Sequence, residues 1–255
     1  MRHIEVKVLN PDTVAQAEQT MVCAARLTQR GQRIKNMDDF MALYNANYTA
    51  QAVRTMTQLP HPTIQKFAVI NVAVVGASRR FLAQITRHQN EVKFMSASLQ
   101  YSDYSGEAGF VVPYEMLDTI HEPMYQADCK AAMETYAAMV EHCVDNDAAG
   151  YLAPQGLRNI LIISATPYQW KHMIGQRTCR RNTDETRYVM LRIWEQLYEL
   201  NPILFAPAVT GPECMRSYCH ELGMSCGDPV HKSFTPAAII AHDFPKLCGG
   251  ETDES

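Results

Sequence analysis

The feature that most constrains the fold is an apolar run, Phe67 to Ala77, that leads directly into a basic segment. The run is rich in Val and Ile, whose branched side chains favour β-strands. Ser78 follows it and belongs to the residue types that cap helix N-termini. The segment after this cap carries Arg79, Arg80 and Arg87. The sequence therefore predicts a strand that delivers a basic helix.

The rest of the chain predicts further helices and one more strand. Charged and apolar residues alternate from His3 to Val8, which is typical of a strand. Apolar spacing, with breaks at Gly and Pro, predicts helices over 12–27, 37–59, 118–144, 157–179 with an interruption near Pro167, and 184–198. Residues 101–114 indicate turns with a strand or hairpin. We expect an α+β domain over 1–205, with a central antiparallel or mixed sheet flanked by helices, and a loop-rich, cysteine-containing C-terminal tail over 206–255.

Composition excludes several classes of protein. The chain has 255 residues, 47% hydrophobic and 20% charged, which excludes a disordered or low-complexity polymer. With 23 basic and 27 acidic residues, the net charge of -4 gives no general attraction to nucleic acid or anionic membrane. No stretch approaches the roughly 18 apolar residues of a membrane span, and residues 1–10 do not resemble a signal peptide. We expect a cytoplasmic protein with reduced thiols and neither nucleic-acid nor membrane partners.

Arginine is concentrated in one short segment. Five arginines fall between positions 177 and 192, namely Arg177, Arg180, Arg181, Arg187 and Arg192. The first three share one face if the segment is helical, and their charges repel unless something neutralises them. Carboxylates elsewhere in the chain or a bound anion would each do so. The spacing leaves both alternatives open.

Two motifs, in order along the chain, resemble those of one enzyme family. Residues 78–88 read S-R-x-F-x-x-Q-x-x-R-H, and residues 98–102 read S-L-x-Y-S. Together they resemble the R-H-R-x-x-S-x-N-E-x-S-x-R-Y motif of the flavin-dependent thymidylate synthases. Residues 177–187 resemble that family's R-C-C-x-R-A-Q-W-E-I-R segment. Weaker correspondences occur at 61–63, 157–161, 170–172 and 211–227, so the resemblance spans residues 60–227.

This resemblance implies a fold, a reaction and an assembly. It implies a homotetramer with active sites between subunits and FAD held by several chains. The implied reaction is the reductive methylation of dUMP to dTMP, with carbon from methylenetetrahydrofolate and hydride from NADPH. A related flavin-dependent C5 modification, such as hydroxymethylation of another pyrimidine nucleotide, is one alternative. A catalytically silent homologue that binds nucleotide or flavin is another.

The resemblance also assigns roles to residues. Arg177 is expected to be catalytic, with its guanidinium stabilising negative charge on the uracil as C5 becomes nucleophilic. The expected nucleotide-binding residues are Gln84, Arg87, Ser96, Ser98, Leu99, Gln100, Arg158 and Arg177. The expected FAD-binding residues are His61, Thr63, Arg87, His88, Gln89, His172 and Arg181. For His61 and His172 a purely structural role is the alternative.

The motifs depart from the family pattern at charged positions. Gln89 stands where the family has Arg, and residues 95–101 lack the acidic residue and one Arg of the motif. The A-Q-W-E-I-R segment becomes N-T-D-E-T-R over residues 182–187. An Arg lost from a phosphate site costs about 1.5–3 kcal/mol per charged hydrogen bond unless another group replaces it. Because of these departures, the two alternative functions, another flavin-dependent C5 modification and a catalytically silent homologue, stay open.

Cysteines in the tail suggest a metal site. Cys214, Cys219, His220 and Cys226 have the spacing C-x4-C-H-x5-C, and three thiolates with an imidazole can ligate zinc. An iron–sulfur cluster, with Cys248 as another possible ligand, and buried or merely reduced thiols are the alternatives. Cys23, Cys129 and Cys143 lie on apolar helical stripes and are expected in the core.

Overall fold

A four-stranded antiparallel sheet forms the centre of the protein. The computed structural model describes residues 1–59, 62–106 and 108–248. The strands β1 (Glu5–Val8), β2 (Ile70–Ser78), β3 (Val92–Ser96) and β4 (Arg158–Ala165) lie in the order β1-β2-β4-β3. The helices are α1 (Pro11–Ala15), α2 (Ala17–Arg30), α3 (Met37–Tyr44), α4 (Ala50–Thr57), α5 (Arg79–Ile85), α6 (His121–Glu141), α7 (Asn146–Ala149), α8 (Pro167–Arg177), α9 (Asp184–Leu200), α10 (Glu213–Arg216) and α11 (Pro236–Asp243). The predicted α+β class, with an antiparallel sheet flanked by helices, is confirmed.

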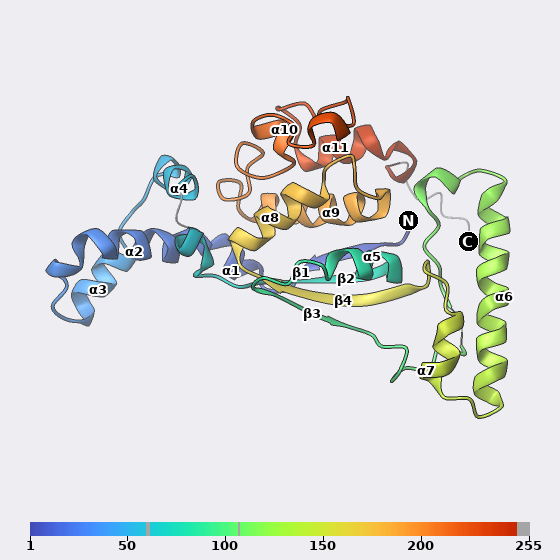
Figure 1. Ribbon diagram of the computed structural model, residues 1–255. Helices are drawn as coiled ribbons and strands as arrows, with labels where there is room; N and C mark the ends of the chain where they lie inside the picture. Colours follow the sequence, from blue (N-terminus) through green and yellow to red (C-terminus); the bar gives the residue numbers. More distant parts are fainter. Residues whose placement is uncertain (60–61, 107, 249–255) are drawn as a thin grey trace.

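Helices α8 and α9 cover one face of the sheet, and the tail helices lie beyond them (Figure 1). The core between the sheet and these helices contains Ile70, Val72 and Val74 of β2 and the fully buried Trp170 and Trp194. The Trp170 indole donates a hydrogen bond to the carbonyl of Ile70 at 3.1 Å, which fixes α8 on the sheet. Packing against the sheet therefore fixes the position of α8. Arg177, the first arginine of the arginine-rich segment, is the last residue of this helix.

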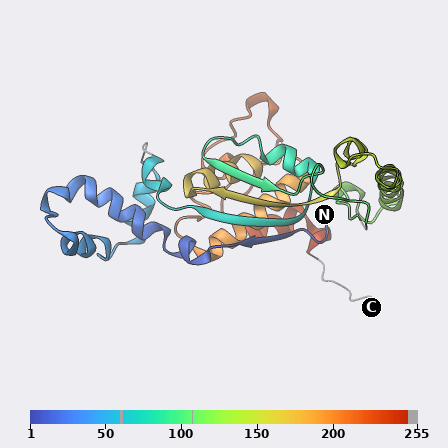
Figure 2. The same cartoon turned by 90° about the horizontal axis from the view of Figure 1, so that it is seen from below.

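Two extensions lie at opposite ends of the sheet (Figures 1 and 2). Helices α2, α3 and α4 form an arm at one end, while α6 and α7 stand at the other. The second extension has its own core, in which Met133, Tyr136, Ala149 and Leu157 are buried and Leu99 packs against them. The loop after β3 is thereby attached to α6 and α7 through Leu99.

The predicted helix over 157–179 is wrong in its first half, because residues 158–165 form β4. Leu161, Ile163 and Ala165 point into the core, whereas Ile160 and Ile162 point to the opposite face and are exposed. Since apolar residues occupy both faces, the period-two alternation of a strand is hidden in the sequence. Pro167 does not interrupt a helix but begins α8, where its missing N–H costs nothing.

The remaining elements show smaller differences. The predicted helices 118–144 and 184–198 are confirmed as α6 and α9, and β2 ends at Ser78, which caps α5 by accepting a hydrogen bond from the Phe81 amide. The helix expected over 37–59 is two helices, α3 and α4, and that over 12–27 is divided at Gln16. Among the described residues of 101–114, the expected turns are present and the expected strand or hairpin is reduced to an isolated bridge between Phe110 and Leu157. Strand β3 was not predicted. No helix in the described chain combines the length and apolarity needed to cross a membrane.

The second face of the sheet is apolar and open. Val75 pairs with Ile160 across β2 and β4, and Ile162 pairs with Met95 across β4 and β3. All four side chains are exposed, Met95 to 74%. Scattered apolar residues are normal on a surface, but a contiguous group across three strands indicates a surface that binds another molecule.

Candidate active site

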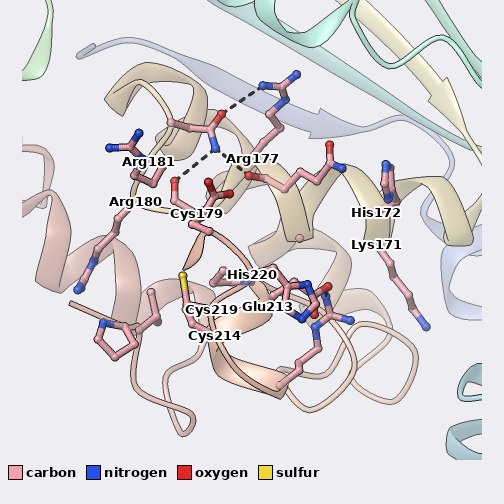
Figure 3. A pocket seen from close by; sticks show the side chains of 18 of the residues that line it. Lys171, His172, Arg177, Cys179, Arg180, Arg181, Glu213, Cys214, Cys219 and His220 are labelled. Atoms are coloured by element: carbon pink, nitrogen blue, oxygen red, sulfur yellow. Dashed lines mark hydrogen bonds and ion pairs between the residues drawn. The ribbon is translucent and has the colours of Figure 1, made fainter. Parts of the chain in front are cut away.

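Arg177 lies at the C-terminal end of α8, and three neighbours hold its guanidinium. Its Nε donates to His88 Nε2 at 2.8 Å, one terminal nitrogen donates to Asn182 Oδ1 at 3.2 Å, and the other donates to the Gln84 carbonyl at 3.0 Å. In Figure 3 a dashed line from Arg177 marks the hydrogen bond to Asn182. Within the described ranges no carboxylate pairs with Arg177. All three acceptors are uncharged, so the guanidinium keeps its full positive charge.

His88 must be neutral to accept this hydrogen bond. Burial, together with the charge of Arg177 and the neighbouring His172, lowers the pKa of His88 to about 4. The Nε2 lone pair is therefore available at neutral pH. Burial and the positive charge of Arg87 also lower the pKa of Arg177, but an arginine remains charged in a protein. The site thus combines a fixed cation with a neutral imidazole.

The arginine segment divides into paired and unpaired members. Asp243 of α11 accepts from Arg180 through both of its carboxylate oxygens, at 2.7 and 3.2 Å, and also pairs with Arg187. Asp228 pairs with Arg180 as well. Carboxylates therefore neutralise Arg180 and Arg187, as one of the two sequence alternatives supposed. Arg177 is left for the other alternative, a bound anion.

The expected nucleotide-binding residues fall into two groups. Gln84 of α5 touches Arg177 directly through its carbonyl, and Arg87 lies close by. Ser96, Ser98, Leu99 and Gln100 occupy the end of β3 and the loop after it, and Arg158 begins β4. No hydrogen bond between described residues joins this loop to Arg177, and Figure 1 shows β3 leading toward α7. Of the expected nucleotide-binding residues that the structure describes, Gln84 and Arg87 are the two beside Arg177.

Ser98 and Arg158, of the second group, make defined contacts within the chain. Ser98 Oγ accepts from the Gln100 amide at 3.1 Å, which closes a turn. The Arg158 side chain packs on Gly109 and donates to the Arg2 carbonyl at 3.2 Å. Its Nε is buried and has no hydrogen-bond partner among the described residues. Such an unsatisfied donor is rare in native proteins and calls for an acceptor.

The expected FAD-binding residues gather partly beside Arg177. The His88 and His172 rings meet edge to face with centroids 5.8 Å apart. His172 and Arg181 are exposed, and in the described part of the chain no carboxylate pairs with Arg181. Thr63 lies in the 3-10 helix Pro62–Lys66, and Gln89 follows His88 on the surface. His61 lies outside the described residues.

A cavity of about 600 Å³ separates α8 from the C-terminal tail (Figure 3). Its lining includes Lys171, Arg177, Cys179, Asn182, Arg216 and His220. Lys171 donates to Gln65 Oε1 at 3.0 Å, and burial lowers its pKa to about 7, with Arg216 adding to this effect and Glu18 opposing it. The tail therefore supplies one wall of a cavity that reaches the arginine segment.

The metal prediction for the tail is not supported. Cys214, Cys219, His220 and Cys226 all line the cavity, but no three His, Cys, Asp or Glu side chains among the described residues form a group that could hold a metal ion. The His220 ring packs on Tyr218 with centroids 4.6 Å apart, and the Cys226 thiol donates to the Asp228 carbonyl. His220 and Cys226 thus contact other partners, and C-x4-C-H-x5-C is not a common zinc spacing.

The cysteines are otherwise close to expectation. All eight are free thiols in the structure. Cys23 and Cys129 are buried, as predicted, whereas Cys143 is exposed. The reason is that α6 ends at Glu141, and Cys143 then adopts a φ of 63° in the turn that leaves the helix.

The fold and the site define an α+β protein in which neutral partners hold an arginine beside a large cavity, an arrangement suited to an anionic substrate. A protein-family model described as "Thymidylate synthase complementing protein" matches residues 11–203. The chain belongs to this family, which confirms the resemblance found in the sequence. A flavin-dependent thymidylate synthase of Geobacter sulfurreducens is 25% identical over 213 residues, covering 82% of this chain and 89% of that protein. One from Pyrococcus abyssi is 28% identical over 171 residues, covering 63% and 68%.

Solved structures share the fold. A UMP/dUMP methylase, PolB, from Streptomyces cacaoi, bound with 5-Br dUMP, has a TM-score of 0.64 and 16% identity over 79% of this chain and 93% of that chain. Thymidylate synthase X from Helicobacter pylori, with FAD and dUMP, has a TM-score of 0.58 and 16% identity over 81% and 99%. The chain is thus a member of a methylating, flavin-dependent enzyme family.

Sequence reasoning missed several residues of the site. Asn182 contacts Arg177, yet the sequence marked it only as a departure from the family motif. Lys171 and Arg216 line the cavity, but Arg216 lies 45 positions after Lys171, in the tail. Only the folded chain brings these side chains together. No spacing rule would have found them.

Proposed function

We propose that the protein catalyses the FAD-dependent reductive methylation of dUMP to dTMP, using methylenetetrahydrofolate and NADPH. The observation that carries this proposal is Arg177, a guanidinium held by Gln84, His88 and Asn182 without a carboxylate partner in the described chain. Membership of the family supports it. So do the fold neighbours, one of which binds FAD and dUMP.

Arg177 would act by charge. Its remaining N–H groups face no acidic side chain among the described residues, so they can bind a uracil carbonyl and stabilise the negative charge that develops as C5 becomes nucleophilic. A positioned cation in a site that excludes water stabilises such charge far better than one in bulk solvent. No cysteine nucleophile is needed, which agrees with the raised pKa that burial gives the Cys179 thiol.

The residues beside Arg177 suit FAD in their chemistry. Imidazole and guanidinium groups donate hydrogen bonds to diphosphate oxygens and to flavin carbonyls, and both types are exposed here at His172 and Arg181. We assign His88, His172, Arg181, Arg87, Gln89, Thr63 and His61 to FAD binding. Bound FAD would supply the hydride transfer from NADPH. The protein's own part is to hold the flavin and the nucleotide together and keep out water.

We assign the loop after β3 to the nucleotide phosphate. Ser96, Ser98, Leu99, Gln100 and Arg158 would hold it, with the buried Arg158 Nε providing an unsatisfied donor. Since this group does not reach Arg177 in one subunit, a complete site needs the loop of a second copy. The open apolar face around Val75, Ile160 and Met95 would carry that contact. These observations support a homotetramer with sites between subunits.

Other expectations stand as proposals. We assign residues 1–205 to the family domain and 206–255 to an added tail, which the end of the family match at residue 203 supports. The predicted cytoplasmic location, and partners limited to small molecules and copies of the chain, fit the net charge of -4.

Anaerobic turnover tests the proposal. Purified protein with FAD, NADPH, methylenetetrahydrofolate and dUMP should give a nucleotide heavier by one methyl group. Arg177→Ala should retain FAD and lose this product. Turnover by the variant at the wild-type rate would remove Arg177 from the mechanism, and the absence of any nucleotide product from the wild type would refute the synthase assignment.

Two observations favour a second reaction. The fold neighbour with the TM-score of 0.64 is a UMP/dUMP methylase, and this chain lacks charges of the family's phosphate motif at Gln89 and within residues 95–101. The substrate would then be another pyrimidine nucleotide, with methylation or hydroxymethylation at C5. Turnover with UMP in place of dUMP, followed by mass analysis of the nucleotide, separates this reaction from the methylation of dUMP. A silent homologue would bind nucleotide or flavin and give no product with either.

A further inference from the structure

The Asn182 side chain bridges Arg177 to the backbone at the end of α8. Its amide nitrogen donates to the Gln176 carbonyl at 2.7 Å and to the Cys179 carbonyl at 3.4 Å. These two acceptors fix which end of the amide is nitrogen, because an oxygen there would face two carbonyls. The Asn182 oxygen must therefore point at Arg177, where it accepts at 3.2 Å.

The contacts of Arg177 leave a defined set of donors. A guanidinium carries five N–H groups. Three are used, one each by His88, Asn182 and Gln84. One N–H therefore remains on each terminal nitrogen, without an acceptor among the described residues. Two such groups held in one plane can bind a planar acceptor, provided that the guanidinium cannot rotate.

Asn182 is the holding group that comes from outside the α5 segment. Gln84 and His88 both belong to residues 78–88, on one side of the guanidinium. Asn182 lies in the turn between α8 and α9 and occupies the first position of the segment that corresponds to A-Q-W-E-I-R. An alanine there has no acceptor for Arg177. The hydrogen bond is therefore a property of this chain rather than of the motif.

We propose that Asn182 is a positioning residue, which sets the plane in which Arg177 presents its two remaining N–H groups to the pyrimidine ring. This inference rests on the proposed function and assigns to that site a second residue, one that acts through Arg177. It predicts that Asn182 matters for recognition of the base and not for recognition of the sugar phosphate. A displacement of about 1 Å in a reacting group can lower a rate by as much as 100-fold.

The variants separate positioning from mere support of the turn. Asn182→Ala removes both the oxygen that accepts from Arg177 and the NH2 group that donates to the backbone carbonyls. Asn182→Ser keeps a hydroxyl that can donate to a backbone carbonyl but is too short to replace the amide oxygen at Arg177. Thr183→Ala is the matched control, because the Thr183 hydroxyl, in the same turn, donates a hydrogen bond to the Thr186 hydroxyl at the start of α9. Among the residues that the structure describes, no hydrogen bond joins Thr183 to Arg177.

The experiment compares two ligands on the FAD-loaded protein. Binding of dUMP and of deoxyribose 5-phosphate is measured by calorimetry, and kcat and KM are measured by dTMP formation. We expect Asn182→Ala and Asn182→Ser to lose 10- to 100-fold in kcat/KM and in dUMP affinity. Their affinity for deoxyribose 5-phosphate should stay within twofold of wild type, and Thr183→Ala should match wild type throughout.

Several results would overturn the inference. Equal losses for both ligands would show that Asn182 only supports the turn, and wild-type values in both Asn182 variants would show that Arg177 does not need it. If Asn182→Ala fails to fold, the comparison is made with Asn182→Ser. Failure of the proposed function is distinguished from these outcomes, because the wild-type protein itself would then not convert dUMP to dTMP.

Discussion

Asp243 is the buried counter-ion of two arginines, and its removal should destabilise the protein strongly. The side chains of Asp243 and Arg187 are each 7% exposed, and that of Arg180 is 12% exposed. Burial by itself raises the pKa of Asp243, but hydrogen bonds from Arg180 and His242 and the charge of Arg187 hold it below its usual value. The carboxylate is thus ionised at neutral pH and faces two guanidinium groups.

The size of the effect follows from this burial. Asp243→Asn leaves Arg180 and Arg187 in place with an amide whose NH2 group repels them. Breaking a buried ion pair by removing one partner costs about 3–5 kcal/mol, because the remaining charge is left unpaired. Each kcal/mol shifts the melting temperature of a chain of this size by roughly 2–4 °C. We therefore expect a decrease of roughly 6–20 °C.

The assay is urea and thermal unfolding followed by circular dichroism at one protein concentration, because assembly makes stability concentration-dependent. Asp228→Asn is the control, since Asp228 also pairs with Arg180 but its side chain is 73% exposed. An exposed pair contributes about 0–1 kcal/mol, so this variant should unfold close to wild type. If both variants differ from wild type by less than 1 kcal/mol, Asp243 does not neutralise the arginine segment and the reasoning fails.

Three further predictions concern α5, His88 and Arg177. Ser78→Ala removes the α5 cap at the Phe81 amide and a donor to Glu185, so unfolding in urea should show a loss of about 2 kcal/mol. His88 has a pKa of about 4 when folded, against about 6.5 when unfolded, so the unfolded chain takes up its proton first as the pH falls. His88 therefore does not lower the free energy of unfolding above about pH 6.5, and it lowers this free energy by roughly 2–3 kcal/mol as the pH falls to 4. His88→Gln should flatten this part of the pH curve, and an unaltered curve would contradict the assignment. Arg177→Lys should lose dTMP formation as fully as Arg177→Ala, since an ammonium cannot make the three contacts of the guanidinium, and appreciable activity of the Lys variant would show that charge alone suffices.

Strand β4 shows where a sequence pattern misleads. Residues 158–165 carry apolar side chains on both faces, one face for the core and the other for the open surface. Periodicity cannot separate such a strand from a buried helix. By contrast, β2 and α5 could be predicted, because Val-rich alternation, a capping serine and the helix after it agree with one another. A strand with apolar side chains on both faces therefore hides its period of two in the sequence.

For a related reason, some residues of the candidate site could be predicted from the sequence and others could not. Gln84, His88 and Arg177 lie in motifs whose residue types and spacing follow from the chemistry, so resemblance finds them. The partners of the other arginines do not lie in motifs, since Asp243 is 63 positions from Arg180 and 56 from Arg187. Five clustered arginines therefore looked equivalent in the sequence, although folding neutralises some and leaves Arg177 for a ligand.

The tail is part of the explanation for the site, although the family match ends at residue 203. Arg180 lies three residues after Arg177, in the turn between α8 and α9, and is held to α11 through Asp243. Asn182, which fixes Arg177, lies in the same turn between α8 and α9. A carboxylate in the tail therefore stabilises the backbone from which both Asn182 and Arg177 project. If this coupling is correct, Asp243→Asn should weaken dUMP binding at temperatures where the variant is still folded, and Asp228→Asn should not.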